Sequence, residues 1–514
     1  MRLTIEERLP WDLEADVLAV TIPTTDEWPA YLTELDRRLA GSLSALRDVG
    51  AAKGSLWSGS LLPASELGAR LVLAVGVGDG SAIDRLGARR LGSVIVRKLA
   101  GLDVSTLAVH LPDELVGRGG ALQAAVVEQL TRGLVEGAAD PSTIYNEPGD
   151  KLPPELSAVS IVVESGDADE LSARGERGRI IGEGGVRTRR LAHRAANDVS
   201  PEVLADEASD LAVAHDLELT VFGPEEAERL GMGMFLAVGR GSDNPPRFIA
   251  LRNKPAQERD ARGRLLAMVG KGVTFDTGGI SLKPPPNMGE MKTDKTGACT
   301  VINAIATAAQ LAPDLPMLAV APAVENMPGP HSTRPGDVVR AMNGKTVEIN
   351  NTDAEGRLIL GDALTWAEQQ GATHIVDVAT LTGAMARALS RYMTGGFASA
   401  DEWWADVASA AARQGEPLWR MPMIDDLRKD IDSPFADMSN VGGPEGGAIT
   451  AALFLREFVE VPWAHLDVAG TAYLTKTDAF STKGSTGVMH ATLVELALDG
   501  VDGRTSTRGE ADPA

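Results

Sequence analysis

Short apolar runs alternate with longer helix-like stretches over the first third of the chain, and this alternation constrains the fold more than any other feature of the sequence. Apolar runs of this length fit buried strands, and strands that alternate with helices indicate an α/β domain. The alternating segments are, in order, residues 17–21, 32–46, 71–77, 88–99 and 107–111.

A change of pattern after residue 145 predicts a domain boundary. The helix pattern gives way to prolines, a crowd of glycines follows around residues 175–185, and strand-like runs at 248–251 and 265–269 open a second α/β unit. A chain of 514 residues exceeds the usual size of one core. We therefore expect an N-terminal α/β domain over residues 1–175 and a larger domain over 186–502 that carries the chemistry. Residues 503–514 lack apolar periodicity and are predicted to be a disordered tail.

The composition excludes several classes of protein. A formal net charge of −23 argues against an extended grip on nucleic acid or on anionic lipid. No apolar run approaches the roughly 18 residues that span a bilayer, and the start of the chain lacks a secretory signal. Cys299 is the only cysteine, so a disulfide within the chain and a Cys-based zinc cluster are both excluded. The expected location is cytoplasmic.

The octapeptide Asn-Thr-Asp-Ala-Glu-Gly-Arg-Leu at residues 351–358 is the strongest chemical signal in the sequence. Asp353 and Glu355 lie between an apolar stretch and a helix-like run at 358–369, so a strand-to-helix turn presents two carboxylates. Loops at strand ends are where α/β proteins place their chemistry. Helix capping explains the octapeptide alone equally well, because Thr352 or Asp353 can cap and Glu355 suits a first turn.

Three further segments add charged groups. Lys271 and Asp276 flank a predicted strand end that is followed by two glycines, Lys283 comes shortly afterwards, and Asp294 follows. Taken singly, each has an ordinary explanation: the lysines fit surface positions, and Asp276 fits a turn before the glycines. Their occurrence together is what needs another explanation.

Charge favours a metal site if these segments meet. Four carboxylates in one site repel each other strongly, but two divalent metals neutralise them. Two metals that activate a shared water are a recurrent hydrolytic device. The chain lacks the His-Glu-x-x-His motif and its seven histidines show no ligand spacing, so the expected site is rich in oxygen. Such a site suits Mn²⁺ or Mg²⁺ and can take Zn²⁺. The four carboxylates are Asp276, Asp294, Asp353 and Glu355.

These segments resemble the signature stretches of the leucine aminopeptidase (cytosol aminopeptidase) family. The likeness covers roughly residues 191–496, while the first 180 residues show only a compatible pattern. The matching segments are residues 269–279, Lys283, 291–294, 351–358, 377–384, 436–440 and 464–472. The resemblance implies an N-terminal α/β domain similar to macro domains and a larger catalytic α/β domain with a mixed central sheet.

The resemblance also implies an aminopeptidase that releases N-terminal residues from short peptides through a water bridged by two metals, Mn²⁺ or Zn²⁺, with Mg²⁺ as an alternative in one position. Lys271, Asp276, Asp294 and Glu355 would hold one metal. Asp276, Asp353 and Glu355 would hold the other, with the backbone carbonyl of Asp353 also contributing. Lysine can be a ligand only as the neutral amine, which a nearby divalent charge favours.

Other roles follow from the same likeness. Lys283 would polarise the scissile carbonyl, Arg357 would hold a bicarbonate ion that relays a proton, and Asp294 would help to bind the free α-amine of the peptide. A pocket for a first side chain such as Leu or Met would be lined by Met291, Thr380 and Gly383. Lys295 departs from the family, which usually has Met there, and places a charge beside Asp294.

The resemblance implies a homohexamer, a dimer of trimers whose active sites face an interior cavity that admits short peptides. Two other functions compete with the peptidase. A DNA-binding or regulatory protein is disfavoured by the acidic charge balance. A different two-metal hydrolase, such as a phosphoesterase, could use similar carboxylates, but a lysine ligand and a carbonyl-facing Lys283 favour peptide chemistry.

Overall fold

The structure is a computed structural model that describes all residues except 26, 65, 81–82, 117–119, 148, 150, 256 and 503–514. The chain divides into two compact units. The first comprises Met1–Val186 and Lys476–Thr482, and the second comprises Arg187–Thr475 and the chain from Lys483 onward. The tail predicted at residues 503–514 lies outside the described residues.

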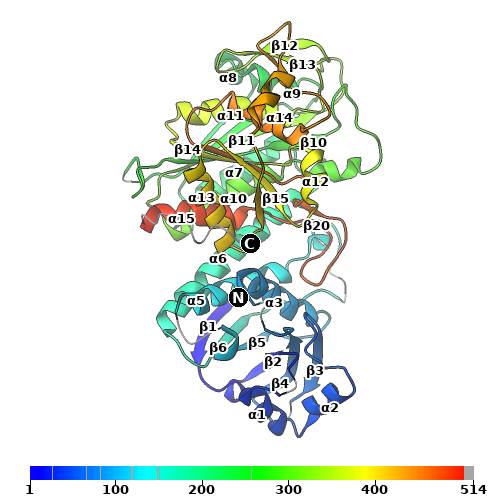
Figure 1. The fold of residues 1–514 in the computed structure, drawn as a ribbon, viewed down its shortest axis with the longest axis vertical. Coiled ribbons are helices and arrows are strands. Elements are labelled where there is room, and N and C mark those ends of the chain that lie inside the picture. The colour runs from blue at the N-terminus through cyan, green and yellow to red at the C-terminus, as the bar shows by residue number, and fades with distance from the viewer. Residues whose placement is uncertain are drawn as a thin grey trace. The chain divides into compact units, whose positions relative to one another are not determined.

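A six-stranded sheet with the order β1-β6-β5-β2-β4-β3 forms the centre of the first unit (Figure 1). Its neighbouring strands are parallel except for β3, which pairs antiparallel with β4. The strands are β1 (Arg2–Glu7), β2 (Ala15–Ile22), β3 (Gly59–Pro63), β4 (Ala69–Gly76), β5 (Thr106–Leu111) and β6 (Ala158–Val163). The helices are α1 (Ala30–Arg38), α2 (Ser42–Asp48), α3 (Arg85–Lys98), α4 (Asp113–Val116) and α5 (Ala121–Ala138). Helix α6 (Ala168–His193) begins in this unit and continues into the second.

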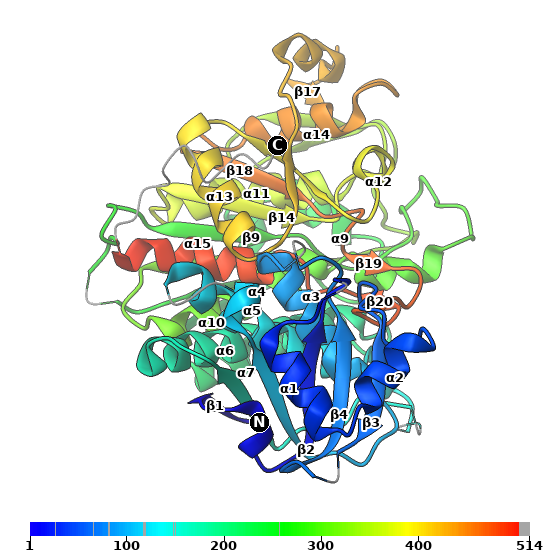
Figure 2. The same ribbon diagram turned by 60° about the horizontal axis from the view of Figure 1, so that its bottom comes forward.

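The surroundings of strand β2 explain the apolar run at residues 17–20. Val17 and Ala19 belong to one core cluster, which includes the buried faces of α3 and α5. Leu18 and Val20 belong to another, which includes buried residues of α1 and α2. Figure 2 shows these two helices beside the strands of this sheet. A strand covered by helices on both faces needs apolar residues at every position, whereas a half-exposed strand alternates.

Two local expectations differ from the structure. The helix expected over residues 32–46 is two helices, because Ala40 (φ 52°) and Gly41 (φ 79°) adopt left-handed backbone that ends α1 and precedes α2. The glycine-rich segment around residues 175–185 lies inside the continuous helix α6, although the two units do divide close to the expected boundary, between Val186 and Arg187 of this helix. Its Gly178 is close to α5: a Cβ there would lie 2.1 Å from the backbone oxygen of Glu128.

The second unit is built on a larger mixed sheet, with the path β16-β15-β18-β14-β9-β11-β8-β7 and with β10 paired to β11. Its strands are β7 (Glu218–Phe222), β8 (Arg247–Arg252), β9 (Leu266–Gly270), β10 (Gly272–Asp276), β11 (Met317–Asn326), β14 (His374–Ala379), β15 (Thr394–Ala398), β16 (Leu418–Arg420) and β18 (Trp463–Asp467). One small sheet contains β12 (Asp337–Arg340), β13 (Thr346–Ile349) and β17 (Met438–Ser439). Another contains β19 (Tyr473–Leu474) and β20 (Gly484–Ser485).

Helices cover this sheet on both faces (Figure 1). One layer contains α7 (Pro201–Ala214), α10 (Thr296–Leu311), α13 (Asp401–Arg413) and α15 (His490–Asp502). The other contains α8 (Pro224–Arg229), α9 (Gly233–Gly239), α11 (Gly356–Gln369) and α14 (Gly447–Arg456). The remaining short helix is α12 (Gly383–Leu389). None of the described helices is long and apolar enough to cross a membrane.

Strand direction places the chemistry at one edge of the large sheet. Strands β9, β11, β14 and β18 are parallel along the centre of the sheet. Strand β8 runs antiparallel to β11, and β15 runs antiparallel to β18. The carboxyl ends of the parallel strands therefore meet at one edge, which is where α/β proteins bind ligands. The two-domain α/β fold with a mixed sheet in the larger domain is confirmed.

Candidate metal centre

Three strands of the central sheet deliver polar residues to its carboxyl edge. Lys271 directly follows β9, Asp276 ends β10, and Thr380 directly follows β14. Because β9 is parallel to β14, and both β9 and β10 are parallel to β11, residues far apart in the sequence leave the sheet on the same side. The sheet topology therefore gathers these groups.

The octapeptide connects β13 to α11, as the strand-to-helix interpretation predicted. Glu355 occupies the N-cap position of α11 but makes no side-chain capping hydrogen bond. The hydroxyl of Thr352 donates instead to the backbone oxygen of Gly278, at 2.6 Å. The capping interpretation is therefore wrong, and the carboxylates of Asp353 and Glu355 face the segment that follows β10.

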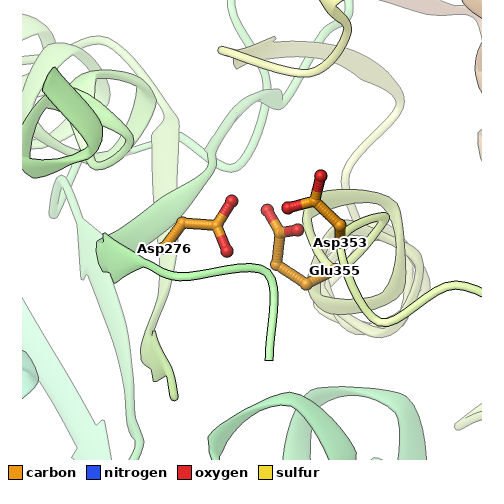
Figure 3. A group of neighbouring side chains, drawn as sticks. All are labelled: Asp276, Asp353 and Glu355. Carbon is orange, nitrogen blue, oxygen red and sulfur yellow. The ribbon is translucent and has the colours of Figure 1, made fainter. Parts of the chain in front are cut away.

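Three carboxylates converge at this point (Figure 3). Asp276, Asp353 and Glu355 each offer one oxygen, and these oxygens all lie within 4.8 Å of one another. Asp276 and Glu355 are each only 2% exposed. The turn-forming role considered for Asp276 is also present, because its Oδ1 accepts a hydrogen bond from Gly278 N at 2.9 Å. No histidine belongs to this group in the described part of the chain.

Lys271 joins Asp294 to this group. Its side chain is buried, and Nζ lies 2.9 Å from Asp294 Oδ2 and 2.7 Å from Glu355 Oε1. Nζ also donates to the backbone oxygen of Thr380 at 2.9 Å. The surface interpretation of this lysine is wrong, because it is 3% exposed and its Nζ contacts two carboxylates of the cluster.

Lys283 approaches the cluster from the opposite end. Its Nζ lies 2.7 Å from Asp276 Oδ2 and also contacts Asp353 Oδ1. The loop that carries it is tied back by a hydrogen bond from Lys283 N to Thr277 O at 2.9 Å. The side chain keeps 21% exposure, so Lys283 lies at the border between the cluster and solvent.

The electrostatics of the cluster favour a bound cation. Burial, and then the carboxylate of Glu355, raises the pKa of Asp276. Burial also raises the pKa values of Asp294 and Glu355, although Lys271 opposes this effect. Burial alone would lower the pKa of Lys271, but the carboxylates of Asp294 and Glu355 raise it above its usual range. Four carboxylates and two lysines leave excess negative charge in a poorly solvated site.

The oxygen atoms of the cluster also fit a divalent metal. Glu355 Oε2 is buried and has no hydrogen-bond partner within the described part of the chain. A buried acceptor without a donor is unfavourable, and a cation satisfies it. A donor set of carboxylates with one amine suits Mn²⁺ and also accepts Zn²⁺.

Arg357 is the second residue of α11 and is buried, with 7% exposure. Its Nη1 donates to the backbone oxygen of Asn440 at 2.9 Å, and its Nε has no partner among the described residues. Burial lowers the pKa of Arg357 to about 10, with Glu355 and Asp467 opposing the effect. A buried guanidinium with an unused donor is suited to holding an anion.

The three predicted pocket residues occupy different environments. The hydroxyl of Thr380 donates to Asp294 Oδ1 at 2.5 Å, so the structure brings this residue to the carboxylates. Met291 lies in the short 3₁₀ helix Met288–Thr293, and its backbone oxygen accepts from Asp294 N at 3.2 Å. Gly383 is exposed and begins α12. The pocket assignment of these residues stays a prediction.

The charge of Lys295 points away from the cluster. The side chain is fully buried, and Nζ donates to the backbone oxygens of Arg194 (2.8 Å) and Lys292 (2.6 Å). Burial lowers the pKa of Lys295 to about 8. The departure from the family pattern therefore anchors the segment before α10 without adding a charge to the carboxylates.

Sequence analysis missed two asparagines that hold the site together. Asn326, at the end of β11, donates from Nδ2 to Asp276 Oδ1 at 2.8 Å and to Thr352 O at 3.0 Å. Asn440 donates from Nδ2 to Asn351 O at 2.7 Å. Asn440 lies in a segment that resembles the family, whereas nothing in the sequence singled out Asn326.

Comparison with known proteins gives a consistent result for both units. The family model "Cytosol aminopeptidase family, catalytic domain" matches residues 186–494, and the corresponding "N-terminal domain" model matches residues 19–139. A protein of Solibacter usitatus, named probable cytosol aminopeptidase, is 43% identical over 97% of this chain and 99% of its own length. A protein of the same name from Koribacter versatilis is 36% identical over 96% and 99% of the two chains.

Solved structures of similar fold cover nearly the whole chain. A mutant of tomato leucine aminopeptidase has a TM-score of 0.87 and 32% identity, covering 97% of this chain and 96% of that chain. The bottromycin maturation enzyme BotP in complex with Mn has a TM-score of 0.80 and 32% identity, covering 94% and 99%. With a family model over more than half of the sequence and a buried cluster of carboxylates that fits divalent metal, the chain belongs to the cytosol aminopeptidase family and is a metal-dependent aminopeptidase.

Proposed function

We propose that this enzyme removes apolar, leucine-like N-terminal residues from short peptides. The observation that carries the proposal is the convergence of Asp276, Asp353 and Glu355, with Lys271 bridging Glu355 to Asp294. Two divalent ions bound there would supply Lewis acidity and activate a shared water for attack on the peptide carbonyl.

The proposed ligand sets are those that the family resemblance implies, and the proximity of these side chains supports them. Lys271, Asp276, Asp294 and Glu355 would hold one ion, with Lys271 as the neutral amine. Asp276, Asp353 and Glu355 would hold the other, with the backbone carbonyl of Asp353. We propose Mn²⁺ or Zn²⁺, with Mg²⁺ as an alternative in one position. The oxygen-rich donor set supports this choice, and so does the Mn recorded with a similar structure.

Two cations of the chain would act on the peptide. Lys283 is a partly exposed side chain whose ammonium group lies beside the carboxylates, so it would polarise the scissile carbonyl and stabilise the oxyanion that develops. Arg357 would hold a bicarbonate ion that carries a proton to the leaving amine, a role supported by its buried and unused Nε. Asp294 would bind the free α-amine, which restricts cleavage to N-termini.

Substrate preference is tested by comparing the kcat/KM values of aminoacyl p-nitroanilides with different first residues. Leu and Met are expected to be cleaved best, because Met291, Thr380 and Gly383 would line an apolar pocket. Acidic first residues are expected to be cleaved at least tenfold less well, because they would add charge to a site already rich in carboxylates. Equal kcat/KM for Leu and Asp substrates would contradict the proposed pocket.

We also propose a cytoplasmic homohexamer, a dimer of trimers whose interior cavity admits short peptides. The name cytosol aminopeptidase carried by the relatives supports the location, and the likeness over nearly the whole chain supports a shared assembly. Light scattering should give a mass of about six times the 53.9 kDa of one chain. A mass near that of one chain would refute the hexamer.

A further inference from the structure

Thr380 contacts two groups of the candidate metal centre at once. Its hydroxyl donates to Asp294 Oδ1 at 2.5 Å, and its backbone oxygen accepts from Lys271 Nζ at 2.9 Å. Asp294 Oδ2 in turn lies 2.9 Å from Lys271 Nζ. The three residues form a closed ring of contacts, so one threonine constrains both side chains.

The loop that carries Thr380 is itself held by hydrogen bonds to Asp467. The next residues bind Asp467, a carboxylate at the end of β18 that is 1% exposed. Leu381 N donates to Asp467 Oδ1 at 3.2 Å, and the hydroxyl of Thr382 donates to Asp467 Oδ2 at 2.7 Å. The buried ends of β14 and β18 therefore hold the loop that presents Thr380.

This arrangement determines what each atom can offer. With Oδ1 of Asp294 engaged by the hydroxyl, Oδ2 is the oxygen that contacts Lys271. The backbone oxygen of Thr380 takes one N–H of Lys271, which restricts rotation of the amine about its last bond. Hydrogen bonds to groups around a metal typically change metal affinity by 10–100-fold when they are removed.

We propose that Thr380 is a positioning residue, whose hydroxyl and carbonyl orient Asp294 and Lys271 and thereby set the affinity of the one metal position that these two side chains share. This inference rests on the proposed function, which assigns both side chains to one ion. It differs from the pocket role predicted for Thr380, because a residue that only lines a pocket would affect KM and leave metal affinity unchanged.

The test uses Thr380→Val, which removes the hydroxyl and keeps the shape of the side chain. Thr380→Ser retains the hydroxyl and is the rescue variant. Thr365→Val is the matched control. Thr365 lies in α11, and the substitution removes a buried hydroxyl that donates to Phe458 O at 3.1 Å. Full-length proteins freed of metal by chelation are titrated with Mn²⁺, followed by calorimetry and by the electron paramagnetic resonance of Mn²⁺.

The proposal predicts that Thr380→Val weakens one of two Mn²⁺ equivalents by about tenfold or more and leaves the other near its wild-type affinity. Thr380→Ser and Thr365→Val should bind both equivalents as wild type does. Unchanged binding of both equivalents by Thr380→Val, with or without a change in KM, overturns the inference but not the proposed function. A wild-type protein that takes up no Mn²⁺ or Zn²⁺ overturns both. If Thr380→Val fails to fold, the same titration of Thr380→Ala decides the question.

Discussion

At the scale of single residues, Asn440 explains how the octapeptide turn keeps its shape without a helix cap. Its Oδ1 accepts from the backbone N of Asn350 (2.9 Å) and of Asn351 (3.2 Å), and its Nδ2 donates to Asn351 O. Its own backbone oxygen accepts a hydrogen bond from Arg357 Nη1. Because buried polar groups are costly when left unpaired, this fully buried asparagine fixes the turn and the arginine together.

Glu355 provides the most direct residue-scale prediction. Glu355→Gln keeps the size of the side chain but removes a charge that faces Lys271, Asp276 and Asp294. Mn²⁺ at a hundredfold excess over its Kd should raise the free energy of unfolding of the wild-type protein by about 3 kcal/mol. We expect most of this gain, and the peptidase activity, to be lost in the variant, whereas its metal-free melting temperature stays near the wild-type value.

The comparison is made by thermal unfolding with and without Mn²⁺. Glu368→Gln is the matched control, because this residue lies on the same helix α11 and accepts a hydrogen bond from Glu460 N. A wild-type Mn²⁺ shift in Glu355→Gln would show that this carboxylate does not bind the metal.

The sequence predicted the charged residues of the site but not the polar residues that hold them. The carboxylates and lysines lie in short contiguous segments that resemble a family, so they could be named before the structure was known. The contact of Thr380 with Asp294 joins residues 86 positions apart, and that of Asn326 with Asp276 joins residues 50 apart. Contacts of that kind depend on sheet register, which no local pattern specifies.

At the scale of elements, glycines in the first unit mark where helices touch. A Cβ at Gly133 of α5 would lie 1.9 Å from the backbone oxygen of Arg89 in α3, and a Cβ at Gly92 would lie 2.2 Å from that of Leu130. A glycine inside a helix costs about 1 kcal/mol relative to alanine. The close packing of α3 on α5 requires these glycines in spite of that cost.

The same helix contact contains an ion pair that predicts how stability depends on pH. Glu136 of α5 accepts from Arg132 Nε at 2.7 Å and from Arg89 Nε, on α3, at 2.8 Å. Burial alone would raise the pKa of Glu136, but Arg132 and Arg89 lower it to about 2. Because the folded pKa lies below the unfolded one, the pair stabilises the protein above about pH 4.5 and this contribution disappears as pH falls toward 2.

Glu136→Gln should therefore lower the free energy of unfolding near pH 6 by up to about 3 kcal/mol, and by progressively less toward pH 3. Urea unfolding at pH 6, 4 and 3 measures the difference, with the exposed Glu66→Gln as control. A difference between variant and wild type that does not change with pH would contradict the assigned ion pair.

Element boundaries show where sequence reasoning stops. The strand-like run at 265–269 corresponds to β9 (Leu266–Gly270), and the helix-like run at 358–369 corresponds to α11. Both elements are buried and therefore have a clear apolar pattern that could be recognised in the sequence. The glycines of α6 looked like a break, since their low helix propensity is the only local signal. Packing of α6 against α5 outweighs that propensity, and packing partners are not visible in a single sequence.

At the scale of the whole molecule, all ten residues predicted for the site belong to the second unit. The carboxyl edge of one mixed sheet and the turn before α11 are enough to assemble the carboxylates and lysines. The first unit has its own sheet and its own core on both faces of that sheet. The account thus assigns metal binding and peptide hydrolysis to the second unit.

The central claim is that this assembled site is a metal-dependent exopeptidase centre that needs a free α-amine. Its most direct test is the hydrolysis of leucine p-nitroanilide by the purified protein with Mn²⁺ or Zn²⁺, beside a chelator-treated sample and an N-acetylated substrate. We expect cleavage that requires the metal and the free amine, so that both controls are inactive. Cleavage that survives chelation, or equal cleavage of the acetylated substrate, would contradict it.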